Sequence, residues 1–132
     1  SAMLADFGVF AGAITRSTMV RAGFHNARVA GLYMGYGWIN NVIECSFEGS
    51  GRTQGLAGLW VDFAANSINV VDSMFEGRLA VGIVANWGTM VRIEGNTIEN
   101  MGGPAIMANQ INALKLRRHE NTFRRMKRFS TV

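Results

Sequence analysis

Apolar and polar residues alternate along short stretches of the chain with a period of two residues. In the stretch 59–75 the apolar members of this pattern are Leu59, Val61, Ile68, Val70 and Phe75. Trp60, Asp62 and Asn69 stand between them, on the opposite face. Because successive side chains of a strand point to opposite faces, the pattern predicts strands with one buried face.

Two landmarks show that this pattern repeats five times. An apolar residue followed by polar residues, glycine or asparagine recurs at intervals of 23, 28, 23 and 25 residues, at Phe24, Phe47, Phe75, Ile98 and Phe123. A small residue before an aliphatic one recurs at intervals of 23, 27, 24 and 23 residues, at Gly8, Gly31, Gly58, Gly82 and Ala105. The two series share their one long interval. They predict turns near 5–27, 28–54, 55–78, 79–101 and 102–125.

The length of the repeat predicts the fold class. A unit of about 23 residues cannot bury its own apolar row, so each unit has to stack on its neighbours. Strands of equal phase stacked about 4.8 Å apart form parallel sheets around one narrow core. The sequence therefore predicts an all-β protein, a parallel β-helix of about five short turns.

The stretch Val91–Ile98, aliphatic-x-aliphatic-x-x-Asn-x-Ile, resembles the right-handed parallel β-helix repeat of the pectin-lyase-like superfamily. The resemblance covers about residues 5–125 and implies a right-handed coil. That superfamily includes polysaccharide lyases, glycoside hydrolases, phage tailspikes and non-catalytic modules, so the resemblance leaves function open. If the chain were an enzyme, the resemblance implies a lyase or a hydrolase. The hydrolase motifs are missing from the chain, and no catalytic residue is assigned.

A series of small or amide residues stands two positions before the first landmark: Ala22, Cys45, Ser73, Asn96 and Asn121. In a β-helix this position turns inward, and stacked amides can bond from coil to coil. We therefore expect a buried polar ladder, with Cys45 as a small buried filler and not a nucleophile.

Composition supports one folded domain. The chain has 132 residues, 48% of them hydrophobic and 17% charged, and no apolar run is long enough for a membrane-spanning helix. Its single cysteine excludes an internal disulfide and a cysteine-built zinc site. No secretory leader is visible, and the compartment stays unassigned. We expect a cloning scar at 1–4, the β-helix domain at 5–125 and a basic tail or cap at 126–132.

The outer face of the strand that follows the second landmark is unusually apolar. Its outward residues are predicted to be Phe10, Tyr33, Trp60, Val84 and Met107, beside a row of Gly31, Gly58 and Gly82. Such a patch favours a subunit interface, in a homodimer or homotrimer, because glycine permits close approach of a partner. The alternatives are a platform on which sugar rings stack, and a surface covered by a loop of the same chain.

Three glutamates, Glu48, Glu76 and Glu99, follow the first landmark on successive turns, between His25 and Arg124. At a spacing of about 4.8 Å they would repel one another. A bound cation such as calcium, a partner's arginine or raised carboxyl pKa values would relieve this repulsion. Solvated glutamates fanned apart are the simpler alternative.

The segment 115–128 carries seven of the 13 basic residues and one acidic residue. The basic residues are Lys115, Arg117, Arg118, Arg124, Arg125, Lys127 and Arg128. Phe123, Met126 and Phe129 recur every three residues, which predicts an amphipathic capping helix over 120–129. Binding of a polyanion is the alternative, with nucleic acid disfavoured because aromatic residues for base stacking are missing there.

These patterns favour a non-enzymatic, self-associating β-helix module with a structural or recognition role. The alternative is a carbohydrate-active protein that holds an acidic polysaccharide on an outer sheet. Trp60 and Tyr33 would then stack on sugar rings, and Arg92 and Lys115 would meet its carboxylates. No metal site and no other cofactor are predicted, and no membrane contact is expected.

Overall fold

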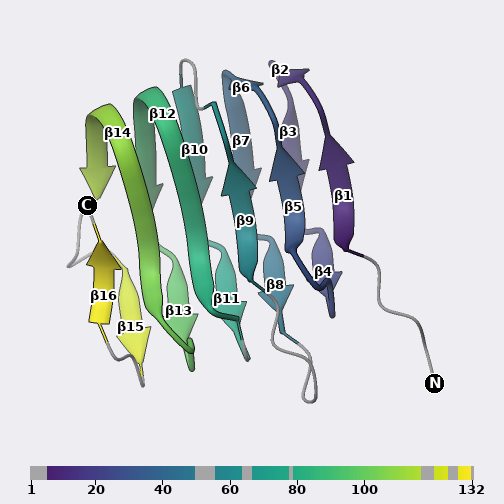
Figure 1. Cartoon of the computed structure of the whole chain (residues 1–132), viewed down its shortest axis with the longest axis vertical. Coiled ribbons are helices and arrows are strands. Elements are labelled where there is room, and N and C mark those ends of the chain that lie inside the picture. The colour runs from purple at the N-terminus through teal and green to yellow at the C-terminus, as the bar shows by residue number, and fades with distance from the viewer. Residues whose placement is uncertain are drawn as a thin grey trace.

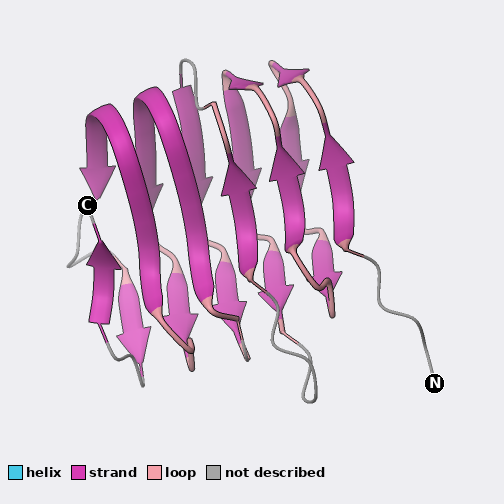
Figure 2. Ribbon diagram, viewed as in Figure 1, coloured by secondary structure: helices cyan, strands magenta, loops and turns pink. Residues whose placement is uncertain are grey.

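The computed structural model describes residues 6–49, 56–63, 67–77, 79–116, 121–124 and 128–131; for Thr89, 112–116 and 128–131 it describes the backbone alone. Every regular element in these ranges is a β-strand (Figure 2). All strand pairs are parallel, because equivalent strands of successive turns stack on one another.

A front sheet forms from the strand that follows the second landmark in each turn (Figure 1). Its members are β1 (Phe7–Ala11), β5 (Ala30–Met34), β9 (Ala57–Val61), the first part of β12 (Val81–Glu94), the first part of β14 (Pro104–Leu116) and β16 (Arg128–Thr131). The register pairs Leu32 with Leu59, Leu59 with Ile83 and Ile83 with Ile106. The repeat read from the sequence is thus the repeat of the stacking.

The rear strands of the coil point down, whereas the front strands point up (Figure 1). Front and rear strands belong to one hydrogen-bonded sheet, because β12 and β14 continue from the front over the top to the rear. The separate rear strands are β3 (Thr18–Val20), β7 (Asn40–Ile43) and β10 (Ser67–Val71). The short strands β2 (Ile14–Thr15) and β6 (Gly37–Trp38) pair with each other at the top.

A lower five-stranded sheet completes the coil. It consists of β4 (Gly23–His25), β8 (Ser46–Glu48), β11 (Met74–Glu76), β13 (Thr97–Glu99) and β15 (Thr122–Arg124). From β4 to β15 the chain makes about 4 turns. It rises in front, crosses at the top and descends behind while it advances from right to left in Figure 1, so the coil is right-handed. The predicted fold class is confirmed, with about 4 turns where the sequence predicts about five.

The core is a set of ladders in which each residue packs on its counterpart one turn away. Phe24 stacks on Phe47 at a centroid distance of 4.8 Å, and Phe47 stacks on Phe75 at 4.6 Å. Ile98 continues the ladder, and Phe123 packs against its end half-buried. The predicted inward residues of 59–75 are all buried. Truncating one such phenylalanine to alanine typically costs about 3–5 kcal/mol.

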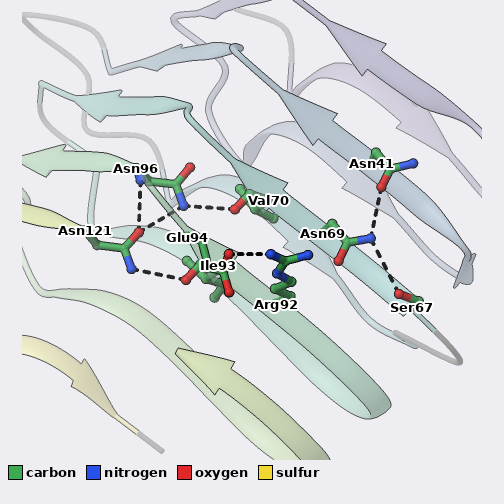
Figure 3. Close-up of polar contacts among 9 residues, drawn as sticks. All are labelled: Asn41, Ser67, Asn69, Val70, Arg92, Ile93, Glu94, Asn96 and Asn121. Carbon is green, nitrogen blue, oxygen red and sulfur yellow. Dashed lines mark hydrogen bonds and ion pairs between the residues drawn. The ribbon is translucent and has the colours of Figure 1, made fainter. Parts of the chain in front are cut away.

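The predicted inner polar ladder is also confirmed (Figure 3). The backbone N–H of Ser73 donates to Asn96 Oδ1 at 2.9 Å, and the N–H of Asn96 donates to Asn121 Oδ1 at 3.0 Å. The Asn96 amide donates to the carbonyl of Val70 at 3.0 Å. Cys45 is buried at the same level, as expected, and its own N–H donates to Ser73 Oγ. Each side chain in the ladder therefore satisfies buried backbone groups.

The rear strands end in a left-handed backbone conformation in four successive turns, at Arg21, Glu44, Asp72 and Gly95, with φ of 52°, 50°, 51° and 69°. This conformation turns the chain inward toward the polar ladder. The register pairs Glu94 with Val71, one residue before Asp72, so Gly95 takes the place of Asp72 in the next turn.

The predicted capping helix over 120–129 is wrong. Thr122–Arg124 forms β15, which extends the lower sheet, and Arg128–Thr131 forms β16, which pairs with β14. Residues 125–127 lie outside the described ranges. The three-residue spacing of apolar residues has a different cause: Phe123 and Phe129 belong to two different strands of the coil. Pairing with the preceding turn satisfies the backbone groups of an open edge, which a lone helix would leave unpaired.

Candidate functional site

The outer surface of the front sheet carries a second apolar cluster that is separate from the core. Ala30, Ala57 and Val84 are buried there. The residues packed around them are half-buried: Phe7, Tyr33, Trp60, Val81 and Met107. The register pairs Phe10 with Tyr33, Tyr33 with Trp60, Trp60 with Val84 and Val84 with Met107. The structure thus brings together the five outward residues that the sequence indicates, and we call this row the outer ridge.

The outer ridge changes character along the coil. Phe10 stacks on Tyr33 at 4.8 Å, and Tyr33 meets the edge of Trp60 at 6.4 Å. Phe10 is 61% exposed, whereas Val84 is only 6% exposed. The ridge is therefore a raised aromatic surface near β1 and a floor near β12.

The glycine row does not belong to this surface, so that part of the prediction is wrong. Gly31, Gly58 and Gly82 are buried and face the phenylalanine ladder inside the coil. A Cβ added to Gly31 would lie 2.8 Å from the Cβ of Phe24, and one added to Gly58 would lie 2.7 Å from the ring of Phe75. Glycine is needed here for packing within the chain, and these residues carry no argument for a subunit interface.

Asp62, which follows β9, accepts hydrogen bonds from three side chains. The sequence indicates that it faces outward but does not mark it as a functional residue. The indole Nε1 of Trp60 donates to Asp62 Oδ1 at 2.8 Å, and the Tyr33 hydroxyl donates to Oδ2. The Asn86 amide donates to Oδ1 at 3.2 Å. The two polar groups of the outer ridge are thus held by one carboxylate, which fixes the orientation of both rings.

The same hydrogen bonds control the charge of Asp62. Partial burial favours the neutral acid, but the hydrogen bonds from Tyr33, Trp60 and Asn86 outweigh it and hold the pKa of Asp62 below its ordinary value. In turn the hydrogen bond to Asp62, with burial and the negative charge, raises the pKa of the Tyr33 hydroxyl. Asp62 is therefore an anion at neutral pH, and Tyr33 stays protonated.

Asp62 begins a polar row that continues along the coil beside the outer ridge. The Asn109 amide donates to Asn86 Oδ1 at 2.8 Å, and Asn86 donates in turn to Asp62. We call Asp62, Asn86 and Asn109 the outer polar row. The sequence does contain its signal, because these residues follow Trp60, Val84 and Met107 by two positions in every case.

A shallow groove of about 350 Å³ lies between these features, on β9, β12 and β14. Its walls and floor are formed by Leu56, Trp60, Val81, Val84 and Met107, with the amides of Asn86 and Asn109 on its polar side. An apolar floor with a few placed amides suits a ligand that has both apolar faces and hydroxyl groups.

Two exposed aromatic residues lie next to the outer polar row. Phe63 follows Asp62, Trp87 follows Asn86, and their rings are 5.4 Å apart at the top of the coil. The sequence analysis did not single out either residue. Asp62 therefore has aromatic residues on both sides in the sequence, Trp60 and Phe63.

The acidic residues form the ladder that the sequence predicts. His25 pairs with Glu48, Glu48 with Glu76, and Glu99 with Arg124. His25 Nδ1 lies 3.0 Å from Glu48 Oε2. Partial burial, a hydrogen bond with Glu99 and the charges of Glu48 and Glu99 raise the pKa of Glu76, against the opposing effect of His25. Within the described ranges no three His, Cys, Asp or Glu side chains are placed to hold a metal ion, calcium included.

Arg92 and Arg124, the two predicted anion-binding residues whose side chains are described, do not line the groove. Arg92 lies in the rear part of β12, where it pairs with Asn69 and contacts Glu94 at 2.6 Å (Figure 3). Arg124 is exposed on the lower sheet. Lys115 and Arg128 belong to β14 and β16, but only their backbone is described. The other four members of the predicted polyanion site lie outside the described ranges: Arg117, Arg118, Arg125 and Lys127.

No family model matches the chain, and no curated protein or solved structure matches it either. Over the described residues, no helix is long and apolar enough to cross a membrane. The function is therefore inferred from the site alone.

Proposed function

We propose that this chain is a glycan-binding β-helix whose site is the groove between the outer ridge and the outer polar row. The arrangement of Trp60 beside Asn86 and Asn109 supports this proposal most strongly. A pyranose ring presents an apolar C–H face and a rim of hydroxyl groups. The face of an indole ring can stack on the apolar C–H face, and amides can donate hydrogen bonds to the hydroxyl groups and accept from them.

The way Trp60 is held strengthens the argument. Its only polar atom, Nε1, is already bonded to Asp62 at 2.8 Å, so the ring contributes an apolar face in a fixed orientation. Rings fixed before the ligand arrives lose little conformational entropy on binding. Asn109 bonds Asn86 through its Nδ2, and within the described ranges no donor reaches its Oδ1, which suits a ligand hydroxyl.

Binding is proposed here, and not cleavage. Glycoside hydrolysis needs two carboxyl groups on either side of the bond, one of them protonated. Asp62 is held ionised by three donors, and the described residues that line the groove supply no second carboxyl group. We also propose membership of the pectin-lyase-like superfamily. The right-handed coil and the inner ladder of stacked asparagines support that assignment.

Calorimetry with neutral and acidic oligosaccharides tests the proposal. We expect binding by the wild type, with a shift of tryptophan fluorescence, and loss of both in Trp60→Ala. Trp38→Ala is the matched control, because Trp38 lies on β6 away from the groove. If Trp60→Ala binds as well as the wild type does, the groove is not the site.

Self-association through the β1 end of the outer ridge is the second candidate function. Phe7 and Phe10 meet at 5.1 Å, Phe10 stacks on Tyr33, and Phe10 is largely exposed. Exposed apolar surface of this kind is typical of an interface, and a second copy of the chain is the proposed partner. Light scattering should then give a dimer or trimer that Phe10→Asp dissociates. A monomeric wild type would contradict this candidate.

A further inference from the structure

We infer that Asp62 makes this site select an uncharged glycan over an anionic one. The inference rests on the proposed glycan-binding function and names the class of ligand. It departs from the expectation of an acidic polysaccharide, because the Asp62 carboxylate lies beside two residues that line the groove.

Asp62 lies directly behind two residues that line the groove. Its Oδ1 lies 2.8 Å from Nε1 of Trp60 and 3.2 Å from Nδ2 of Asn86, and both of these residues line the groove. A ligand that stacks on Trp60 and bonds Asn86 is therefore one side chain away from a carboxylate.

The charge of Asp62 is not neutralised by its partners. Its three donors are a phenol, an indole and an amide, none of which carries charge. Among the described residues, the ion pairs engage Asp6, Glu44, Glu48 and Glu94, and Asp62 is in none of them. The donors stabilise the ionised form, so the negative charge persists when the groove is filled.

This fixed charge acts differently on the two classes of glycan. A uronate bound in the groove would bring its own carboxylate toward Asp62, and the two charges repel in a partly desolvated site. At a separation of several ångströms and an intermediate dielectric, one such repulsion weakens binding about tenfold. A neutral sugar avoids this repulsion and still meets the Asn86 and Asn109 amides.

The experiment compares hexamers of equal length, all joined through 1,4-linkages, that differ in charge. Calorimetric titration of the wild type with cellohexaose, mannohexaose and hexagalacturonate should give binding of at least one neutral hexamer. Hexagalacturonate should bind about tenfold more weakly at low salt, and high salt should narrow this ratio because it screens the repulsion.

Asp62→Asn supplies the decisive variant, because asparagine keeps the size and an acceptor oxygen but loses the charge. We expect hexagalacturonate to bind about tenfold more tightly to this variant than to the wild type, while neutral hexamers change less. Asp72→Asn is the matched control. It changes the net charge equally, lies at the exposed lower corner of the rear sheet, and places a residue that tolerates the left-handed conformation there.

The possible outcomes distinguish a failure of glycan binding from a failure of selection by charge. No binding of any hexamer overturns the proposed function and this inference with it. Hexagalacturonate binding as tightly as the neutral hexamers, with loss in Trp60→Ala, retains glycan binding and overturns the selection by charge. An unchanged ratio in Asp62→Asn also overturns it. If Asp62→Asn does not fold, the salt dependence of the wild-type ratio decides, and a ratio that salt does not move contradicts the inference.

Discussion

Two polar ladders run along this coil, one inside and one outside, and they differ in what they bond. The inner ladder of Ser73, Asn96 and Asn121 is buried, and each of its side chains bonds backbone N–H groups or carbonyls, besides one bond from the Asn96 amide to Asn121 Oδ1. The outer polar row bonds side chain to side chain, from Asn109 to Asn86 and from Asn86 to Asp62.

The difference shows that the fold requires the residues of the inner ladder, whereas it can form without those of the outer polar row. Removing an inner amide without another hydrogen-bonding side chain in its place leaves buried backbone groups without partners, which is costly. Removing an outer amide leaves the backbone ladder intact, and water can replace the lost partner. The residues of the outer polar row are therefore better evidence of function, and those of the inner ladder are evidence of the fold.

The largest expected effect comes from cutting the inner ladder. Asn96→Ala removes the acceptor of the Ser73 N–H and the donor to the Val70 carbonyl, both of them buried. We expect the free energy of unfolding to fall by about 3 kcal/mol or more. Asn86→Ala is the matched change in the outer row, and we expect a loss below about 1 kcal/mol. Chemical denaturation measures both, and equal losses would refute the distinction.

A second prediction compares Gly58 of β9 with Gly12, which follows β1. Gly58→Ala forces a Cβ to within 2.7 Å of the Phe75 ring and 2.9 Å of the Phe47 Cβ, whereas nothing lies within 4 Å of a Cβ at Gly12. We expect Gly58→Ala to lower the free energy of unfolding by about 1–3 kcal/mol because of overpacking. Gly12→Ala should change it by less than about 0.5 kcal/mol. A neutral Gly58→Ala would mean that the glycine row does face outward.

The core residues were predictable from the sequence because each turn stacks on the previous one and places equivalent residues at equivalent positions. Phe47 and Phe75 stand at equivalent positions in successive units, and one repeat length places both rings in the same ladder. The side of Gly31 was not predictable from alternation. Ala30 and Tyr33 pack outside while Gly31 and Leu32 both face inward, because the chain turns a corner there and the alternation restarts.

The candidate site was predictable only in part. Tyr33 and Trp60 stand out in the sequence because large aromatic residues on an outward position are unusual. Asp62 is an ordinary polar residue of a strand until the register sets Asn86 beside it and the two rings donate to it. Local spacing also misled at Phe123, where a helical interval of apolar residues crosses two strands of different sheets.

The acidic ladder provides the smallest expected effect and extends the comparison to a third ladder, on the outside of the lower sheet. Burial, the hydrogen bond with Glu99 and the neighbouring carboxylates raise the pKa of Glu76 in the folded chain. The folded chain therefore holds this proton to higher pH than the unfolded chain does. The resulting stability is present in acid, below the unfolded pKa, and is lost as the pH rises through the folded pKa.

Glu76→Gln keeps a neutral group beside Glu99 and removes this titration. We expect the variant to be more stable than the wild type by about 0.5 kcal/mol at neutral pH, because Glu76 is partly exposed and solvent screens the repulsion. The difference should close in acid. Glu44→Gln is the control, because it removes the exposed ion pair with Arg21 and should give no gain at neutral pH. Thermal unfolding across this pH range measures both variants. A difference that does not depend on pH would show that the three glutamates act as separate solvated side chains and not as one ladder.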